Sequence, residues 1–585
     1  MGGTSMSVWT ETEGTFKSWD GTELFSRTWK PKIPSDKAVI IIHRGHEHSG
    51  RVGQQVEELE LTDFWAFSWD NRGHGKSPGA RGHANSYYDL VKDLNSFAHY
   101  ISENHAIKME NIVVVANSVG AVTASTWVHD FAPRIRAMVL AAPAFRIKLY
   151  VPFAIPGLRL LRKFKGSATI SSYVKSKMLT HDRAEARKYD RDELITRDIA
   201  VNILLGLHDT ATRIMDDAGA IIAPTLILSA GSDWVVKNSA QCRFFERLSS
   251  SKKEMEVYPG FFHAILYEKQ REKPIKKARE FIREAFEEQI DRSGLLKADK
   301  GGFTRTEYDI LRQAPGNPKA IYFGFQKLML RTGGRLSKGI RLGWKTGFDS
   351  GKTLDYVYEN VPRGITAIGR IIDRFYLDTI GWKGIRVRGR NIELCLARLI
   401  EKISAEKGSV RVMDIAAGCG RYVLNTLEEI PNSNVSVLLR DYDSANVEAA
   451  EKLATTMALE NVQCQQGDAF NASSLMAVKP KPDIVIVSGL YELFQDNVLV
   501  SESLKGVAGA IKTGGYLIYT GQPWHPQVEM IARTLVNRDA EPWIMRRRTQ
   551  AEMDELVREA GFKKLEMEID EWGIFTVSIA RRVKS

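Results

Sequence analysis

The chain has 585 residues, a formal net charge of +11 at pH 7 and 43% hydrophobic residues, and this length predicts several domains rather than one core. It contains no uncharged apolar run long enough to cross a bilayer, and its first residues lack the pattern of a signal peptide. The four cysteines show no C-x-x-C spacing, which argues against a disulfide framework or a structural zinc site and favours a reducing, cytoplasmic compartment.

Residues 8–290 are predicted to form the first domain, because strand-like and helical segments alternate there as in a parallel sheet covered on both faces. A hairpin opens it at Asp20-Gly21. The segments 37–43 and 64–70 read as buried strands, and each is followed by a loop that contains glycine. Since ligands bind beyond the carboxyl ends of parallel strands, we expect these loops to converge on one site.

The segment 112–121 predicts a buried strand that turns sharply into a helix, with Ser118 at the corner. Such a corner exposes the hydroxyl and directs the first helical N–H groups towards whatever the serine attacks. A serine that only caps a helix is the common alternative. Two later strands end near Asp233 and His263, and this order predicts that His263 takes a proton from Ser118 while Asp233 orients the imidazole.

The loop sequences around this predicted triad carry a resemblance to a known family. They read His-Arg-Gly-His-Glu-His-Ser-Gly-Arg at 43–51 and Asp-Asn-Arg-Gly-His-Gly-Lys-Ser at 70–77, and with the triad they resemble the monoacylglycerol lipase and lysophospholipase group of α/β-hydrolases. The resemblance implies an oxyanion hole made by the backbone N–H groups of Gly45 and Val119. Arg44 and Ala116 replace glycines of that group, and either side chain could crowd the acyl pocket.

Residues 145–217 interrupt the alternation of strands and helices, at the place where this group of hydrolases inserts its cap. The apolar run 149–158 is followed at once by four cations, Arg159, Arg162, Lys163 and Lys165. This pattern suits docking to an anionic lipid surface, and it equally suits a cap that packs over an acyl tunnel. The sequence leaves both interpretations open.

Residues 291–365 are predicted to be a basic connector. Between residues 320 and 352, Lys and Arg alternate with apolar and aromatic residues, and Asp349 is the single acid. Such a stretch can bind a membrane surface or nucleic acid, or it can be a solvated face between domains. Because no nucleic-acid-binding signature accompanies it, we expect no nucleic-acid partner.

Residues 366–585 are predicted to form a second doubly wound α/β domain. The segment 410–422 reads as a strand, a turn of small residues and the start of a helix, which is the geometry of a nucleoside-cofactor loop and by itself would also fit NAD. The next strand ends in Asp441 and Asp443, placed for ribose hydroxyls, and Asp468 follows the third strand, placed for an adenine amine. Each acid could instead be a strand-end cap.

The ordered set resembles the class I S-adenosylmethionine-dependent methyltransferases, with Ala416 in place of one glycine of the loop motif. The resemblance implies S-adenosyl-L-methionine as the cofactor. It assigns Asp414, Ala416, Gly418 and Gly420 to the methionine side of the cofactor. It assigns Asp441 to the ribose, with Asp443 as the alternative, and Asp468 and Ala469 to the adenine. Candidate acceptor-side residues follow strand ends at Tyr491, Glu492, Gln522, Trp524 and His525. No metal ligand set is expected.

The whole chain resembles a bacterial fusion of a lysophospholipase-type hydrolase with a methyltransferase. The resulting hypothesis is a bifunctional enzyme that hydrolyses a carboxylic ester and methylates a lipid-like substrate, with peripheral contact to the inner face of an anionic membrane. Two alternatives stay open for the first domain: a hydrolase fold that serves only as a binding module, and a peptidase-type hydrolase.

Overall fold

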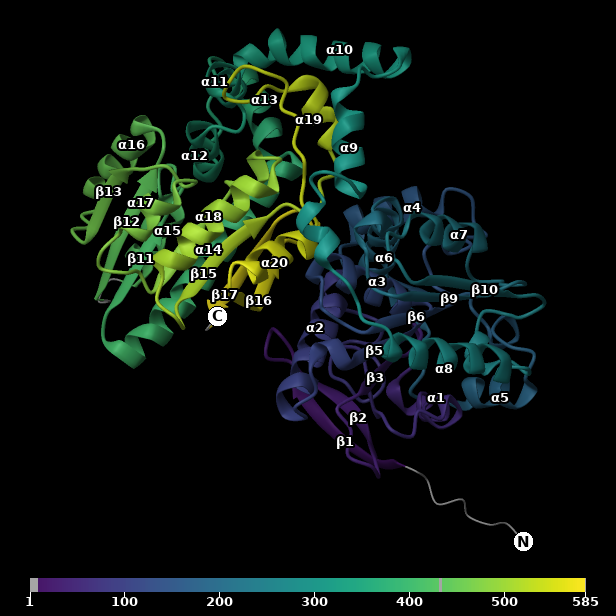
Figure 1. Cartoon of the computed structure of the whole chain (residues 1–585). Helices are drawn as coiled ribbons and strands as arrows, with labels where there is room; N and C mark the ends of the chain where they lie inside the picture. Colours follow the sequence, from purple (N-terminus) through teal and green to yellow (C-terminus); the bar gives the residue numbers. More distant parts are fainter. Residues whose placement is uncertain (1–8, 431–433, 584–585) are drawn as a thin grey trace. The chain divides into compact units, whose positions relative to one another are not determined.

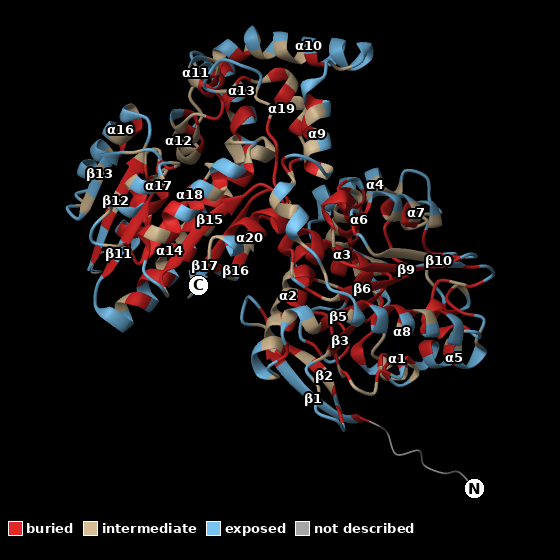
Figure 2. Ribbon diagram, viewed as in Figure 1, coloured by how far each residue is buried: buried red, intermediate tan, exposed pale blue. Residues whose placement is uncertain are grey.

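The computed structural model describes residues 9–430 and 434–583, and it divides after Asp291 into two compact units (Figure 1). Each unit contains one large sheet with helices packed on it. Figure 2 shows that the buried residues concentrate on these sheets and on the inner sides of their helices. The predicted fold class, two doubly wound α/β domains in sequence, is confirmed.

The first unit has an eight-stranded sheet in the order β1-β2-β4-β3-β5-β6-β9-β10. The strands β4 to β10 of that order run parallel, and β1 and β2 are antiparallel at one edge. The bounds are β1 (Trp9–Lys17), β2 (Glu23–Pro31), β3 (Ala38–Ile42), β4 (Trp65–Trp69), β5 (Ile112–Asn117), β6 (Ala137–Ala141), β9 (Thr225–Ala230) and β10 (Lys253–Tyr258). The central strands β3 and β5 are buried along their whole length because helices cover both faces.

The helices that cover this sheet are α1 (Gly53–Leu59), α2 (Tyr87–Asn104), α3 (Val119–Phe131), α7 (Asn238–Arg247) and α8 (Glu272–Glu287). The segment 145–217, for which the sequence predicts a cap, lies between β6 and β9. It consists of α4 (Ala154–Lys165), β7 (Thr169–Ser171), α5 (Arg183–Arg191), β8 (Asp198–Ala200) and α6 (Val201–Asp216). The cap therefore lies at the carboxyl ends of the parallel strands, where the predicted site residues lie.

The second unit has a seven-stranded sheet in the order β13-β12-β11-β14-β15-β17-β16. Five strands are parallel, and β17 inserts antiparallel between β15 and β16. The bounds are β11 (Val410–Asp414), β12 (Val435–Asp441), β13 (Val462–Gln466), β14 (Ile484–Val487), β15 (Tyr516–Gly521), β16 (Phe562–Ile569) and β17 (Thr576–Arg582). The strand order reverses between β11 and β14, and this switch point is where a Rossmann-like sheet binds its ligand.

Helices pack on both faces of the second sheet. They are α14 (Ile380–Lys407), α15 (Arg421–Glu429), α16 (Ser444–Thr456), α17 (Ala472–Met476), α18 (Asn497–Ala510) and α20 (Gln550–Glu559). The short helix α19 (Val528–Thr534) instead buries Val528 and Ala532 against Leu311. Apolar residues spaced three and four apart along α14, such as Ile392, Leu396 and Leu399, are buried against the sheet. This spacing places them on one face of the helix.

The stretch expected as a basic connector is mainly helical and lies within the second unit. Its helices are α9 (Phe303–Arg312), α10 (Asn317–Arg331), α11 (Lys338–Thr346) and α12 (Gly351–Glu359), and α13 (Ala367–Leu377) follows. The buried Asp373 carboxylate joins three of them, since it accepts hydrogen bonds from Ser337 Oγ, from Tyr356 Oη and from the backbone N–H of Gly339 at 2.9 Å. Most of α10 is exposed (Figure 2).

Candidate active sites

In the first unit, β5 leads directly into α3 through Ser118, which has φ 53° and ψ −109°. A positive φ is unfavourable for serine, and such strain is typical of functional corners. The helix starts close to the neighbouring strand: a Cβ added to Gly120 would lie 2.7 Å from Ile42 Cγ2. The glycine two residues after the serine is therefore required by packing, and the predicted sharp corner is present in the structure.

The side chains of Ser118, His263 and Asp233 form one hydrogen-bonded chain. His263 Nε2 lies 2.8 Å from Ser118 Oγ, and His263 Nδ1 lies 2.8 Å from Asp233 Oδ2. All three residues are buried. They come from the ends of β5 and β9 and from the loop after β10, so strands far apart in sequence bring together the residues that the sequence analysis selected.

The Asp233 carboxylate is held in its ionised form. Burial raises the pKa of Asp233. The neighbouring His263 and the hydrogen bonds that the carboxylate accepts lower it by more, so the pKa lies below its ordinary value. Besides His263, the donors are the backbone N–H groups of Val235 and Val236, at 2.7 and 2.9 Å from Oδ1. An ionised Asp233 fixes the imidazole orientation and stabilises its protonated form.

Gly45 and Val119, the predicted oxyanion-hole residues, both border the cavity that contains Ser118. They approach each other closely, since a Cβ added to Gly45 would lie 2.8 Å from Val119 Cγ2. His74 Nε2 lies 2.9 Å from the Gly45 carbonyl oxygen and fixes the loop. A larger residue at position 45 would push the two backbones apart.

The two departures from the hydrolase pattern do not fill the pocket. Arg44 borders the cavity, but its guanidinium is paired with Glu47, at 2.9 Å from Nε to Oε2, and its carbon Cζ lies 5.1 Å from the centre of the Tyr267 ring. Ala116 is fully buried within β5 and is not one of the residues that line the cavity. A cavity of about 640 Å³ remains open beside Ser118.

The cap residues have two kinds of surroundings. Several side chains of 149–161 line the cavity, so part of the apolar run covers the predicted acyl pocket. Three of these lining residues, Tyr150, Val151 and Phe153, are at the same time more than half exposed. Leu160 and Phe164 do not line the cavity and are exposed next to the cations of α4. The structure therefore contains features of both interpretations of this segment.

The loop histidines form hydrogen bonds with other parts of the protein. His43 Nε2 accepts from the Asn71 backbone N–H at 3.2 Å, and His46 Nε2 lies 2.9 Å from Ser172 Oγ. Within residues 9–430 and 434–583, no group of three or more His, Cys, Asp and Glu side chains could hold a metal ion.

In the second unit, β11 ends in Asp414, and the chain then turns through Gly418 and Gly420 with φ angles of 55° and 66°. Nothing lies within 4 Å of a Cβ added to Gly418, whereas a Cβ on Gly420 would lie 2.5 Å from Leu439 Cδ1. The first glycine thus borders open space, and the second allows the loop to pack on β12. This is the geometry of a loop whose backbone a ligand can approach.

Two carboxylates shape this loop. Asp441 Oδ2 accepts from the Gly418 N–H at 2.8 Å, and Oδ1 accepts from Asn446 Nδ2 at 3.0 Å. Asp414 is buried behind the loop and accepts from Tyr422 Oη at 2.7 Å and from the Ala416 N–H at 3.0 Å. Burial raises the pKa of Asp414 to about 7, against the lowering effect of these hydrogen bonds. Asp414 therefore orients the loop from inside the fold.

A crevice of about 100 Å³ runs along the glycine loop. The predicted residues that border it are Ala416, Gly418, Gly420 and Asp441. Asp414, Asp468 and Ala469 do not border it: Asp468 Oδ1 accepts from the Phe470 N–H at 2.8 Å, in the turn after β13. The start of α12, which belongs to the stretch expected as a connector, supplies Gly351, Leu354 and Asp355 to the crevice.

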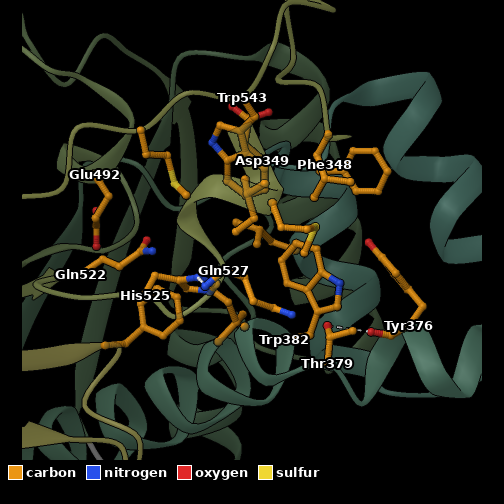
Figure 3. A pocket seen from close by; sticks show the side chains of 18 of the residues that line it. Phe348, Asp349, Tyr376, Thr379, Trp382, Glu492, Gln522, His525, Gln527 and Trp543 are labelled. Atoms are coloured by element: carbon orange, nitrogen blue, oxygen red, sulfur yellow. Dashed lines mark hydrogen bonds between the residues drawn. The ribbon is translucent and has the colours of Figure 1, made fainter. Parts of the chain in front are cut away.

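A larger cavity of about 420 Å³ adjoins this crevice (Figure 3). Crevice and cavity share five lining residues, namely Asp349, Leu354, Arg388, Gly489 and Leu493. Of the candidate acceptor-side residues, Glu492, Gln522 and His525 line the cavity. Tyr491 and Trp524 do not, and Tyr491 Oη donates to Ser503 Oγ at 2.9 Å in the core.

The sequence analysis missed Arg388. Its spacing from Ile385 and Ile392 places it on the apolar face of α14, where it is buried. A charged residue on an apolar helix face is a signal that the sequence does carry. To find the lining residues that α10 and α12 contribute, one would have had to predict that these helices fold onto the second domain.

The fold and the two sites define an α/β-hydrolase unit followed by a Rossmann-like unit. A family model described as "Serine aminopeptidase, S33" matches residues 33–270, and one described as "Putative methyltransferase" matches residues 278–582. The second match spans more than half of the chain, so the chain belongs to the putative methyltransferase family. In this chain the methyltransferase-type domain follows a hydrolase domain.

A relative covers almost the whole chain: "Uncharacterized protein YnbC" of Escherichia coli is 46% identical over 572 residues, 97% of this chain and 98% of its own length. "Phospholipase YtpA" of Bacillus subtilis is 25% identical over 43% of this chain and 97% of its own. A monoacylglycerol lipase of Mycolicibacterium smegmatis is 22% identical over 44% and 92%. The solved monoacylglycerol lipase of Paleococcus ferrophilus covers 47% of this chain and 99% of its own at 23% identity and a TM-score of 0.40.

Among the helices of the described residues, none combines the length and the apolar character that a bilayer-spanning segment needs.

Proposed function

We propose that the protein is a bifunctional enzyme, with an ester hydrolase in the first unit and an S-adenosyl-L-methionine-dependent methyltransferase in the second. The observation that carries the hydrolase is the Ser118–His263–Asp233 chain, with two contacts of 2.8 Å at the wall of a large cavity. The observation that carries the methyltransferase is the open glycine loop beside Asp441 at the switch point of the sheet.

In the proposed hydrolysis, Ser118 Oγ attacks the ester carbonyl carbon while His263 Nε2 takes the hydroxyl proton. The developing oxyanion faces the backbone N–H groups of Gly45 and Val119. His263 then gives its proton to the leaving alkoxide, and the bond between the carbonyl carbon and that oxygen breaks. Water releases the acyl group from Ser118 by the reverse sequence of proton transfers.

An ester with a long acyl chain is the proposed substrate because cap residues such as Leu158 and Leu161 line the cavity with apolar surface. Lipases and a phospholipase among the relatives support the same class. The test is labelling with an alkyl fluorophosphonate, followed by turnover of acyl esters and of aminoacyl anilides. Absence of label at Ser118 favours a binding module, and faster turnover of the anilides favours a peptidase.

For the methyltransferase, the residues that would hold the cofactor are Ala416, Gly418, Gly420 and Asp441. They fit it because the loop is open at Gly418 and because a carboxylate oxygen accepts about two hydrogen bonds, so Asp441 keeps acceptor capacity for a ribose hydroxyl. Bound there, S-adenosyl-L-methionine supplies an electrophilic methyl group. The chain's own task is then to position the acceptor in line with it.

Asp414 is proposed to position the glycine loop, and Asp468 and Ala469 are proposed to contact the adenine. The last two follow β13, which pairs with β12 in the sheet, so they can contact a ligand that extends past Asp441. Calorimetric titration with S-adenosyl-L-homocysteine tests the cofactor proposal. Lack of binding at ligand concentrations up to the millimolar range would refute it.

Peripheral contact with an anionic lipid surface is also proposed, on the basis of two helical surfaces. The first is α4 with its exposed apolar residues and cations. The second consists of α10 and α13, which expose Ile321, Tyr322, Phe325, Leu328, Ile368, Ile371 and Phe375 next to Arg331, Arg370 and other cations. Apolar side chains rimmed by cations are the pattern of an interfacial helix.

A further inference from the structure

We propose that the 420 Å³ cavity of the second unit is the methyl-acceptor site, and that it takes an uncharged molecule with a long hydrocarbon chain and a terminal hydroxyl group, whose proton goes to Glu492. This inference rests on the proposed methyltransferase function. It adds the acceptor class and the proton acceptor, neither of which follows from the fold.

The cavity lies next to the proposed cofactor site. It shares Arg388 and Gly489 with the crevice along the glycine loop, so a molecule inside it lies next to a ligand of that loop. Its volume falls within the range of about 300–1,000 Å³ that is common for small-molecule sites. An acceptor bound there would be adjacent to the methyl group, as in-line transfer requires.

Most of the wall is apolar. Side chains of Phe348, Trp382 and Trp543 surround the space (Figure 3), and Leu535 and Phe575 also line it. Phe325 and Met329 of α10 also line it, although both are more than half exposed. The cavity therefore reaches the exposed apolar side of α10, and a hydrocarbon chain can enter it there from a lipid phase.

One group of polar side chains in the cavity consists of Glu492, Gln522 and His525, which lie close together (Figure 3). Other polar lining residues, Asp349, Tyr376 and Thr379, lie away from this group. Glu492 Oε1 accepts from Thr520 Oγ1 at 2.9 Å, and Thr520 Oγ1 accepts from the Gly489 N–H at 2.9 Å. Glu492 Oε2 is buried and has no hydrogen-bond partner among the described residues. A buried carboxylate oxygen without a partner indicates that a donor is supplied by the ligand.

The charges at this end favour a neutral ligand. Arg388 Nη1 lies 4.0 Å from Glu492 Oε1, both side chains are largely buried, and Arg388 Nε has no partner among the described residues. An ammonium group next to Glu492 would face Arg388, and a carboxylate next to Arg388 would face Glu492. A hydroxyl avoids both repulsions and can donate to Oε2.

His525 does not compete with Glu492 for the proton. Its Nδ1 accepts from the Gln527 backbone N–H at 3.0 Å, which assigns the ring proton to Nε2. Burial lowers the pKa of His525 to about 4, so the ring is neutral at pH 7. His525 thus offers a donor to the cavity, and Glu492 is the base.

The proposed step transfers the methyl group to the hydroxyl oxygen of the acceptor. The hydroxyl oxygen of the acceptor attacks the methyl carbon, and an O–C bond forms while the bond from that carbon to sulfur breaks. The electron pair of the broken bond stays on sulfur, and the hydroxyl proton moves to Glu492 Oε2. The products are a methyl ether, S-adenosyl-L-homocysteine and the protonated carboxyl group, which then returns its proton to water.

Binding is tested with a glycerol ether that carries a dibrominated C18 chain, a neutral alcohol that an ester hydrolase cannot cleave. Bromine quenches tryptophan fluorescence at short range. Trp382 and Trp543 line this cavity, whereas the residues that line the cavity of the first unit include no tryptophan. We expect saturable quenching that is mostly lost in the Trp382→Phe/Trp543→Phe variant and kept in a Trp19→Phe/Trp234→Phe control.

Quenching of equal size in the two double variants, or none in the wild type, overturns the proposed acceptor site. Circular dichroism of each variant excludes loss of fold as the cause. If S-adenosyl-L-homocysteine binds but the ether does not, the acceptor inference fails and the cofactor proposal stands. If the ether binds and S-adenosyl-L-homocysteine does not, the cofactor proposal fails.

The role of Glu492 is tested by Glu492→Gln, with Glu541→Gln as a control at an exposed position. Methyl transfer to the ether from labelled cofactor is expected to fall by about 10²-fold or more in Glu492→Gln, as for loss of a general base. Quenching by the ether is expected to stay within twofold of the wild type. Full activity of Glu492→Gln, or transfer to a long-chain amine in preference to the alcohol, would refute this assignment.

Discussion

The two units place their chemistry differently. In the first, the proposed nucleophile, base and orienting acid belong to the chain and contact one another, with two distances of 2.8 Å. In the second, the chain forms an open loop and a crevice, and the reactive group of the proposed activity comes from a ligand. The first site is therefore visible as a set of side-chain contacts, whereas the second is visible mainly as backbone shape and as polar atoms without partners.

The units also have a feature in common. Each contains a large apolar cavity bordered by a helix with exposed apolar side chains and cations, α4 in the first and α10 in the second. Because both cavities open beside such a helix, substrates of both proposed activities would be drawn from the same kind of lipid surface.

The largest expected effect separates the two activities. Ser118→Ala is expected to lower ester hydrolysis by about 10⁴-fold or more, as loss of a serine nucleophile does, and to leave methyl transfer unchanged. Hydrolysis of a chromogenic acyl ester and transfer of a labelled methyl group measure the two. Ser171→Ala is the control, since Ser171 borders the same cavity without contacting the triad. A parallel fall in methyl transfer would mean that the units depend on each other.

The next effect compares the two basic surfaces. Arg331 ends α10, and two further exposed cations, Arg335 and Arg341, follow it in the turn after α10 and in α11. Replacing all three by Gln should weaken the affinity for anionic vesicles, measured by sedimentation, by about 10²-fold, at about 1 kcal/mol for each cation near the surface. The same change at Arg162, Lys163 and Lys165 of α4 shows which surface dominates. Three exposed lysines of the α8 region, Lys269, Lys273 and Lys276, provide the control. Unchanged sedimentation of both sets of variants would remove the membrane proposal.

A smaller effect is expected for cofactor affinity. Asp441→Asn should weaken binding of S-adenosyl-L-homocysteine by about tenfold, because an amide accepts from a ribose hydroxyl less strongly than a carboxylate does. Calorimetry measures the change, and ester hydrolysis should not respond. Asp443→Asn is the matched control: Asp443 Oδ1 caps α16 at the Ala445 N–H, a role that Asn also fills. A larger loss in Asp443→Asn would transfer the ribose contact to that residue.

The last effect concerns stability and pH. Because burial raises the pKa of Asp414 to about 7, the folded protein keeps a proton between pH ~4 and pH 7 that the unfolded chain has lost. Stability of the second unit should therefore fall as pH rises through this window, by at most about 1.4 kcal/mol per pH unit. Asp414→Asn should remove this fall. Hydrogen exchange of the β11 amides between pH 5 and 8 measures the free energy of unfolding of this unit. An equal pH dependence of that free energy in the wild type and in Asp414→Asn would contradict the prediction.

Some of the site was predictable because the signal is local. Ser118, Asp233 and His263 each follow a strand marked by a run of apolar residues, and the rule that ligands bind at the carboxyl ends of parallel strands joins them. The same reasoning found Gly418 and Asp441. Asp468 also follows a strand, but its carboxylate caps a turn and does not border the crevice, so its contact with the adenine stays a prediction.

What the sequence determined by itself is the presence of two α/β domains and the strand-end positions of the candidate site residues, since these depend on periodicity and on short motifs. Only the tertiary structure decided that residues 292–365 fold onto the second unit, that Arg44 pairs with Glu47 instead of blocking the pocket, and that Arg388 and Glu492 lie at one end of an apolar cavity. Those facts depend on which helix faces meet in space, and contacts between residues far apart in the chain leave no periodic trace in the sequence.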